Sequence, residues 1–412
     1  MSIASQDSDR SVPRTRLRQG DASRDGRGRL RSGPAIFHYG FRPFFLLGAL
    51  SAGIALPAWL VMLLTGVAPS GPFDAMQWHA HEMVFGYLAA IVAGFVLTAV
   101  PNWTGRLPLS GAPLAGLVAL WLAGRLATGL LAQPVAAAVI DAAFLALLAA
   151  SVWREIIAGR NWRNTPVALM LSLLCIANLL HHLEAAGFGV PGFAMRLALG
   201  AIVVLLALIG GRIVPSFTRN WLARQATLSL PAGFGRLDRV ALLATTLAIF
   251  GWLFWPYHEA TATLLFIGGS LLAARLSRWR PLATVREPIV AILHLGYGWL
   301  ALSLVLMGTA IVWPAAVAPG TALHALTAGA VGTMTLAVMT RASLGHTGRE
   351  IVADGWTLAI YLAVTVGALI RVGAGLVPAF YLPLLAAGGL IWSLAFVLFV
   401  IRYGPILMRP RL

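Results

Sequence analysis

The histidines are the residues of this chain best suited to chemistry, because most of the nine lie in long apolar segments. Neutral imidazole is the commonest metal ligand in proteins. Ionisable side chains inside a membrane are rare unless they are paired or functional. We expect the metal and cofactor ligands to come from His79, His81, His182, His294, His324 and His346.

The first candidate pair stands in W-H-A-H-E-M at 78–83. Residues two apart on a regular helix point about 200° from each other. His79 and His81 could therefore serve two metal centres on opposite faces of one helix. They could instead chelate a single metal if the helix starts only after His81, or simply cap a helix start beside Trp78.

Two further candidates have glycines close by. His324 stands in LHALTAGAVG at 323–332, and His294 stands in HLGYGW at 294–299. Small residues beside a histidine allow a flat macrocycle to approach the helix, and they equally allow a neighbouring helix to approach. His182 is less specific, since His181 precedes it, and we expect His258 in a polar turn to be solvated.

Two arginines are embedded in apolar segments. Arg125 and Arg371 need internal partners there, and Asp141 and Glu82 are the acidic side chains available. Arg371, together with Arg341, could also hold haem propionates or another anionic ligand. Many arginines near the ends of apolar segments need no such role, because they set the orientation of a membrane protein.

The composition determines the elements that must position these residues. The chain is 59% hydrophobic and 11% charged, whereas an ordinary soluble domain has about 25% charged residues. The fold class is therefore an all-α, polytopic membrane helix bundle, since a span needs about 20 apolar residues. We expect twelve spans near 43–65, 79–101, 113–132, 135–157, 166–187, 193–217, 237–255, 259–276, 288–312, 319–341, 355–373 and 379–402.

Two regions differ in composition. Residues 1–35 are rich in Arg, Gly and Ser, which predicts a disordered, basic cytoplasmic tail, and residues 36–412 form a single transmembrane domain. With the tail inside, twenty-seven of the thirty arginines fall on the inner side of the predicted spans, so both termini are expected in the cytoplasm. This asymmetry accounts for the net charge of +16 without nucleic acid.

Longer motifs resemble a known family. They are GFRPFFL at 40–46, WHAHEMVFG at 78–86, AGFVLTAVPNWTG at 93–105, GGRIVPSFTRNW at 210–221, HLGYGW at 294–299 and LHALTAGAVGTMTLAVMTRASLGHTGR at 323–349. Together they resemble the NnrS family over nearly the whole chain after the tail. The resemblance implies a twelve-span, multi-pass protein of the bacterial inner membrane that contains haem and copper. It implies a role in the response to nitric oxide, in denitrification and in tolerance of nitrosative stress.

The same resemblance implies the ligands. His79, His81, His294, His324 and His346 fall on its motifs, with His182 behind them. We expect the main metal centre among His79, His81, His182 and His324, which fall in the outer half of the predicted spans. A second centre is expected from His294 with His346. Any haem would be b-type, because the chain has no C-x-x-C-H attachment motif.

The function expected from the sequence is a haem b- and copper-binding protein that holds nitric oxide or, as an oxidoreductase, converts it. Conversion would need quinol or another electron donor. Nitric oxide is apolar, so a metal centre within the bilayer could meet it there. Two alternatives remain: a transporter for a metal or small anion, with histidines and arginines lining its path, and an integral b-type electron-transfer cytochrome.

Overall fold

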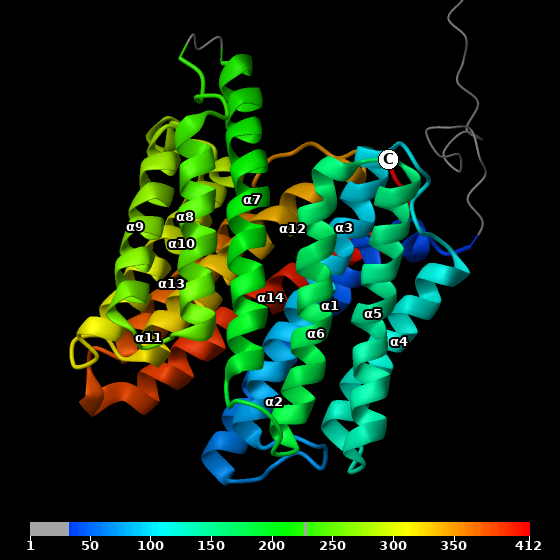
Figure 1. The fold of residues 1–412 in the computed structure, drawn as a ribbon. Helices are drawn as coiled ribbons and strands as arrows, with labels where there is room; N and C mark the ends of the chain where they lie inside the picture. Colours follow the sequence, from blue (N-terminus) through cyan, green and yellow to red (C-terminus); the bar gives the residue numbers. More distant parts are fainter. Residues whose placement is uncertain (1–32, 226–228) are drawn as a thin grey trace, which may run out of the picture.

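The computed structural model describes residues 33–225 and 229–412, and these form helices joined by turns (Figure 1). Twelve helices of the described part are long and apolar enough to cross a membrane. Each corresponds to one predicted span, so the predicted fold class is confirmed. Residues 1–32 of the predicted tail lie outside the described residues.

The spans and connecting helices have the following bounds. The spans are α1 (Phe41–Thr65), α2–η3–α3 (Ala75–Thr104), α4 (Ala112–Leu130), α5 (Pro134–Ala158), η4–α6 (Trp162–Ala185), α7 (Phe193–Arg224), α8 (Arg236–Phe254), α9 (Glu259–Ser277), α10 (Pro288–Val312), α11–η6–α12 (Pro319–His346), α13 (Gly355–Ala374) and η7–α14 (Pro378–Met408). Two short helices, η2 (Ala35–Phe37) and η5 (Pro281–Thr284), lie outside the spans.

Local signals explain where several spans begin and end. Asp74 precedes α2, and its Oδ1 accepts a hydrogen bond from the Gln77 backbone N–H at 2.8 Å. Such a cap satisfies an otherwise unpaired donor of the first turn. Gly66 ends α1 with φ 73°, a left-handed conformation that glycine adopts without steric cost. Prolines at the first positions of α5 and α10 need no backbone donor there.

Two spans are divided by π-helical segments. The second consists of α2 (Ala75–His81), η3 (Glu82–Leu88) and α3 (Ala89–Thr104), and the tenth of α11 (Pro319–His324), η6 (Ala325–Val331) and α12 (Gly332–His346). They are the most buried spans, with 78% and 72% of their apolar windows buried. The π-helical turns directly follow His81 and His324, and such turns are frequent at functional sites.

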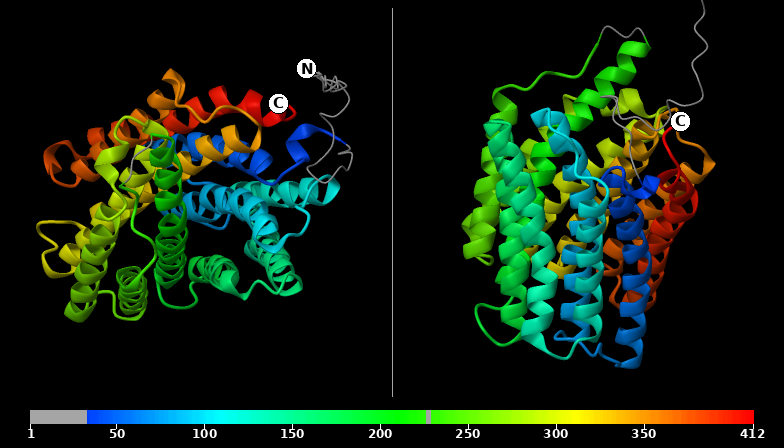
Figure 2. Two further views of the ribbon diagram at one scale, coloured as in Figure 1. Left: turned by 90° about the horizontal axis from the view of Figure 1, so that it is seen from above. Right: turned by 90° about the vertical axis from the view of Figure 1, so that its right-hand side faces the viewer.

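Several of the remaining spans pack against these two or against one another. α1 packs on α3 and α14, α13 packs on α14, and α10 packs on η6 and α12. α7 contacts α6, α8 and α10, so it links the helices that precede it in the chain to those that follow it (Figure 2). The Tyr87 hydroxyl lies 2.5 Å from Thr335 Oγ1, which connects the second span directly to the tenth.

Both described chain ends lie at one end of the bundle, which we call the proximal end (Figure 1). Arg42 at the start of α1 donates to the carbonyls of Leu407 and Arg409 at 2.7 and 2.6 Å. The opposite end, where α1 runs into α2 and α6 into α7, is the distal end. Of the predicted ligands, His79, His81, His182 and His324 lie in the distal half and His294 and His346 in the proximal half.

Candidate functional site

His79 and His81 face different surroundings, as helix geometry predicts. α2 begins at Ala75, which excludes a helix that starts only after His81. The His79 ring stacks on Trp59 with centroids 4.1 Å apart and lines a cavity. The His81 ring is completely buried in a cluster of polar side chains on the other side of the helix. One short helix thus serves two sites.

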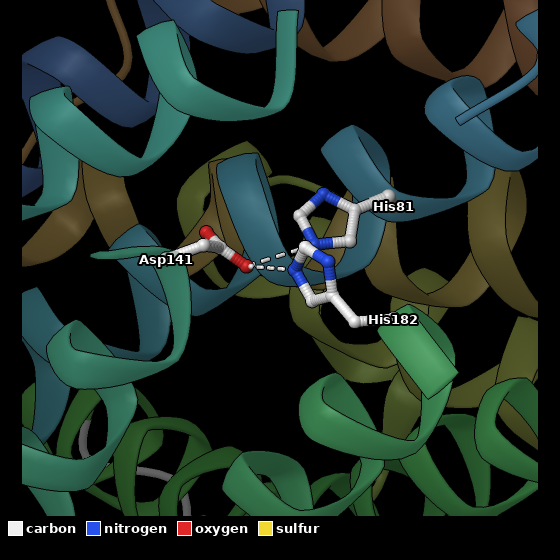
Figure 3. Close-up of side chains that lie close together, drawn as sticks. All are labelled: His81, Asp141 and His182. Atoms are coloured by element: carbon white, nitrogen blue, oxygen red, sulfur yellow. Dashed lines mark hydrogen bonds and ion pairs between the residues drawn. The ribbon is translucent and has the colours of Figure 1, made fainter. Parts of the chain in front are cut away.

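The first site joins three helices. His81 from α2, Asp141 from α5 and His182 from α6 place one ligand atom each within 4.8 Å of one another (Figure 3). Asp141 Oδ2 lies 3.0 Å from His81 Nε2 and 3.2 Å from His182 Nε2. All three side chains are buried. Two imidazoles and a carboxylate that converge in this way can hold a metal ion.

Other buried groups fix the Asp141 carboxylate. The Arg125 guanidinium donates to Glu82 Oε1 at 2.8 Å and also to Asp141 Oδ1, so the predicted acidic partners of Arg125 are confirmed. Asn178 Nδ2 donates to Asp141 Oδ2 at 2.8 Å. Oriented ligands of this kind are typical of metal sites.

The cluster has one positive charge too few and one hydrogen-bond acceptor too many for a neutral His81. His81 faces oxygen acceptors on both ring nitrogens: Glu82 Oε1 at 3.3 Å from Nδ1, and Asn178 Oδ1 and Asp141 Oδ2 near Nε2. A neutral imidazole has only one N–H and cannot donate to both sides. With Glu82 and Asp141 ionised and Arg125 charged, the cluster also lacks one positive charge. A proton on His81 or a bound metal ion supplies it.

Glycines make space for the buried ion pairs. A Cβ on Gly86 would lie 2.7 Å from Arg125 Nη1, and one on Gly124 would lie 2.9 Å from Asp141 Oδ1. Both distances are shorter than real contacts of such atoms. A larger residue at either position would push the charged groups apart.

An aromatic side chain closes the cluster. The Phe73 ring, 3% exposed, lies in the connection before α2. Its centroid is 4.7, 5.1 and 4.8 Å from the rings of His81, His181 and His182. The contacts cover one side of the imidazoles with hydrocarbon, which strengthens the electrostatic interactions beneath it.

The second site is a cavity of about 400 Å³ between α1, the second and tenth spans, α7, α13 and α14. His79, His324 and Arg371 are the histidines and the arginine of its lining. The rest of the lining is mainly apolar or small and includes Leu56, Trp59, Met83, Leu199, Ala328, Leu385, Gly388, Gly389 and Trp392. A mostly apolar cavity with a few convergent polar groups is typical of a ligand site.

The hydrogen bonds of His324 favour one tautomer. Its Nδ1 lies 2.7 Å from the Gly320 carbonyl oxygen and 3.1 Å from Arg371 Nη2. The carbonyl only accepts and the guanidinium only donates, so the two contacts need opposite tautomers. The shorter one places the proton on Nδ1 and leaves the Nε2 lone pair free for a metal, an arrangement common for ligating histidines.

The predicted proximal residues do not form a common site in the described chain. His294 Nε2 lies 2.8 Å from the Thr218 hydroxyl, whereas the His346 ring lies against Phe41. No hydrogen bond or ring contact between described residues joins the two histidines. The guanidinium carbon of Arg341 lies 3.9 Å from the centroid of the Phe217 ring. Arg341 does not line the cavity that contains Arg371.

The histidine expected to be solvated has a capping role. His258 is exposed and precedes α9, where its Nδ1 accepts from the Ala260 backbone N–H at 3.1 Å.

Sequence reasoning did not assign Asp141, Asn178 and His181 to the candidate site. The sequence predicts Asp141 only as a partner for an embedded arginine, and it makes His182 a less specific candidate because His181 precedes it. One signal could have identified the group: Asn178 and His182 are four residues apart and therefore share a helix face. The pairing with Asp141 requires the packing of α5 against α6.

Comparison with known proteins identifies the family. The model of the family described as NnrS protein matches residues 35–411, nearly all of the described chain. No curated protein matches the chain. With twelve helices that can cross a membrane and a match of this extent, the chain belongs to the NnrS family.

Proposed function

We propose that this protein binds haem b and copper and that it binds or turns over nitric oxide at a histidine-ligated metal centre within the bacterial inner membrane. Membership of the NnrS family suggests a membrane protein of the nitric-oxide response. One observation carries the assignment of two metal sites: His79 and His81 open onto separate sites on opposite sides of one helix.

The cavity fits haem. Haem is flat and largely apolar and has anionic propionates, and the cavity combines an apolar lining with imidazoles and a guanidinium. His79 Nδ1 and Arg371 Nη1 are buried and have no hydrogen-bond partner among the described residues. His79 and His324 would hold the iron, and Arg371 would bind a propionate.

The buried cluster fits copper. The Nε2 atoms of His81 and His182 and Oδ2 of Asp141 are its candidate ligands, and imidazole is a preferred ligand of copper. Arg125 and Asn178 would hold the carboxylate in place. The missing positive charge of the cluster matches a monovalent copper ion.

When bound, haem iron and copper supply nitric-oxide binding and one-electron chemistry. The side chains create the conditions for it. The apolar lining around Leu56, Leu385 and Trp392 suits a small apolar gas, and Phe73 keeps water from the imidazoles of the cluster. If nitric oxide is converted, the electrons come from quinol or another donor.

The experiment is a cofactor analysis of protein purified in detergent from cells supplied with haem and copper. We expect a Soret band, near-stoichiometric copper and a shift of the reduced Soret band upon addition of nitric oxide. The His324→Ala variant should lose the haem and retain copper, whereas His182→Ala should do the reverse. Wild-type protein without either cofactor would refute the proposal.

A further inference from the structure

A second cavity of about 370 Å³ lies beside the buried cluster at the distal end and shares Met76, Ala80 and Met195 with the lining of the larger cavity. Its lining includes Met76, Gln77, His181, Glu184 and Met195, together with the connection from Gly187 to Gly192. Met76 is 57% exposed, so the rim of the cavity reaches the protein surface. The proposed function above uses neither this cavity nor His181.

His181 connects the cavity to the cluster. It lines the cavity but is only 6% exposed, and its ring centroid lies 5.6 Å from that of His81 with an angle of 27° between the planes. Its Nε2 lies 3.3 Å from the Gln77 carbonyl oxygen and must donate to it. The proton on Nε2 leaves Nδ1 with a lone pair, and Nδ1 is buried without a partner among the described residues.

The donors of this cavity favour a soft cation. Thioethers and imidazole bind monovalent copper, whereas magnesium and calcium prefer oxygen ligands. The one carboxylate in the lining is engaged elsewhere, since Glu184 accepts from the backbone N–H groups of Gly192 and Ala194 at 3.0 and 2.7 Å. The remaining metal donors are Met76, Met195 and His181.

Two other sides of the cluster are covered. Phe73 covers the three imidazoles. Arg125 contacts Asp141 Oδ1, opposite the oxygen that faces His81 and His182, and its charge repels a cation. The cavity at His181 is thus a side from which a cation meets thioether and imidazole donors.

We propose that His181 is a transfer ligand that passes monovalent copper from the thioethers of Met76 and Met195 to the site formed by His81, Asp141 and His182. The steps are ligand exchanges, so copper keeps its oxidation state and no covalent bond of the protein changes. The inference rests on the proposed copper site but concerns the route by which that site is filled.

The test is the rate at which copper-free protein in detergent takes up buffered Cu(I), followed together with the final copper content. In His181→Phe, which retains a planar ring, we expect the final content to equal that of wild type. We expect its loading to be about tenfold slower, because losing a transient ligand raises the barrier. Met195→Leu should also slow loading, whereas Met62→Leu, outside the cavity, should not.

The outcomes separate the two proposals. Wild-type protein that takes up no copper would remove both the copper site and the transfer role. Wild-type uptake together with equal loading rates in His181→Phe and Met195→Leu would remove the transfer role alone. If His181→Phe fails to fold, the comparison of Met195→Leu with Met62→Leu decides.

Discussion

Arg125 is the side chain on which the buried cluster depends for charge balance. It is the only arginine in contact with Glu82 and Asp141 among the described residues. Removing one partner of a buried ion pair leaves the others uncompensated. We expect metal-free Arg125→Met to lose about 3–5 kcal/mol of stability, measured by unfolding in detergent.

The control for this variant is Arg154→Met. Arg154 pairs with Glu155, but its side chain is 66% exposed, so the expected loss is about 0–1 kcal/mol. An equal loss of unfolding free energy in Arg125→Met and Arg154→Met would contradict the role of Arg125 in the charge balance of the cluster.

The sequence predicts which residues are candidate ligands better than it predicts which of them lie together in one site. Their place in apolar segments makes His79, His81, His182 and His324 candidate ligands, and all four lie at the two candidate sites. The association of His294 with His346 rested only on their common end of the bundle. Which residues meet depends on how each helix is rotated about its axis, and the sequence of one span does not determine that.

At the level of helices, the cavity depends on the close packing of α13 and α14. A Cβ on Gly388 would lie 2.9 Å from the backbone nitrogen of Arg371, so a larger residue must push the helices apart. The atoms nearest to a Cβ on Gly389 would be side-chain atoms of Leu56 and Leu60, at 3.5 Å or more, which is ordinary van der Waals contact. Both glycines line the cavity.

We therefore expect neighbouring substitutions to differ. Gly388→Ala should cost about 1–3 kcal/mol by overpacking and should lower the haem content by displacing Arg371. Gly389→Ala should leave both unchanged. Melting temperature and the Soret absorbance per protein test this, and equal haem contents in the two variants would be inconsistent with the packing described here.

The spans could be predicted from apolar length, but their details could not. α7 continues to Arg224 and α14 to Met408, beyond the apolar windows that predicted them. The π-helical turns after His81 and His324 are not predicted by the sequence either. Their backbone register depends on contacts with other spans, such as that of Tyr87 with Thr335. The apolar pattern of one span does not show which residues of another span it will contact.

At the scale of the whole molecule, the arginines of the described residues are distributed unequally between the two ends. The three that are not assigned to the inner side, Arg125, Arg196 and Arg371, all lie in distal halves of spans. Two of them belong to the candidate sites. The place of Arg125 and Arg371 in the distal half therefore has a local cause. The arginines of the described residues other than Arg125, Arg196 and Arg371 favour a cytoplasmic proximal end.

Reporter insertions test this orientation. A C-terminal green fluorescent protein should be fluorescent if the proximal end faces the cytoplasm, as the arginines predict. Alkaline phosphatase inserted after Gly189 in the distal connection should be active, since it needs an oxidising compartment. Phosphatase activity at the C-terminus and none at Gly189 would reverse the topology and place both metal sites at the inner half of the membrane.

The central claim is that two histidines on one helix serve two different metal sites. It is tested most directly by measuring haem and copper in purified His79→Ala and His81→Ala. We predict that His79→Ala loses the Soret band of wild type but keeps its copper, and that His81→Ala loses copper but keeps the Soret band. Loss of the same cofactor in both variants, or a Soret band unchanged in His79→Ala, would contradict the claim.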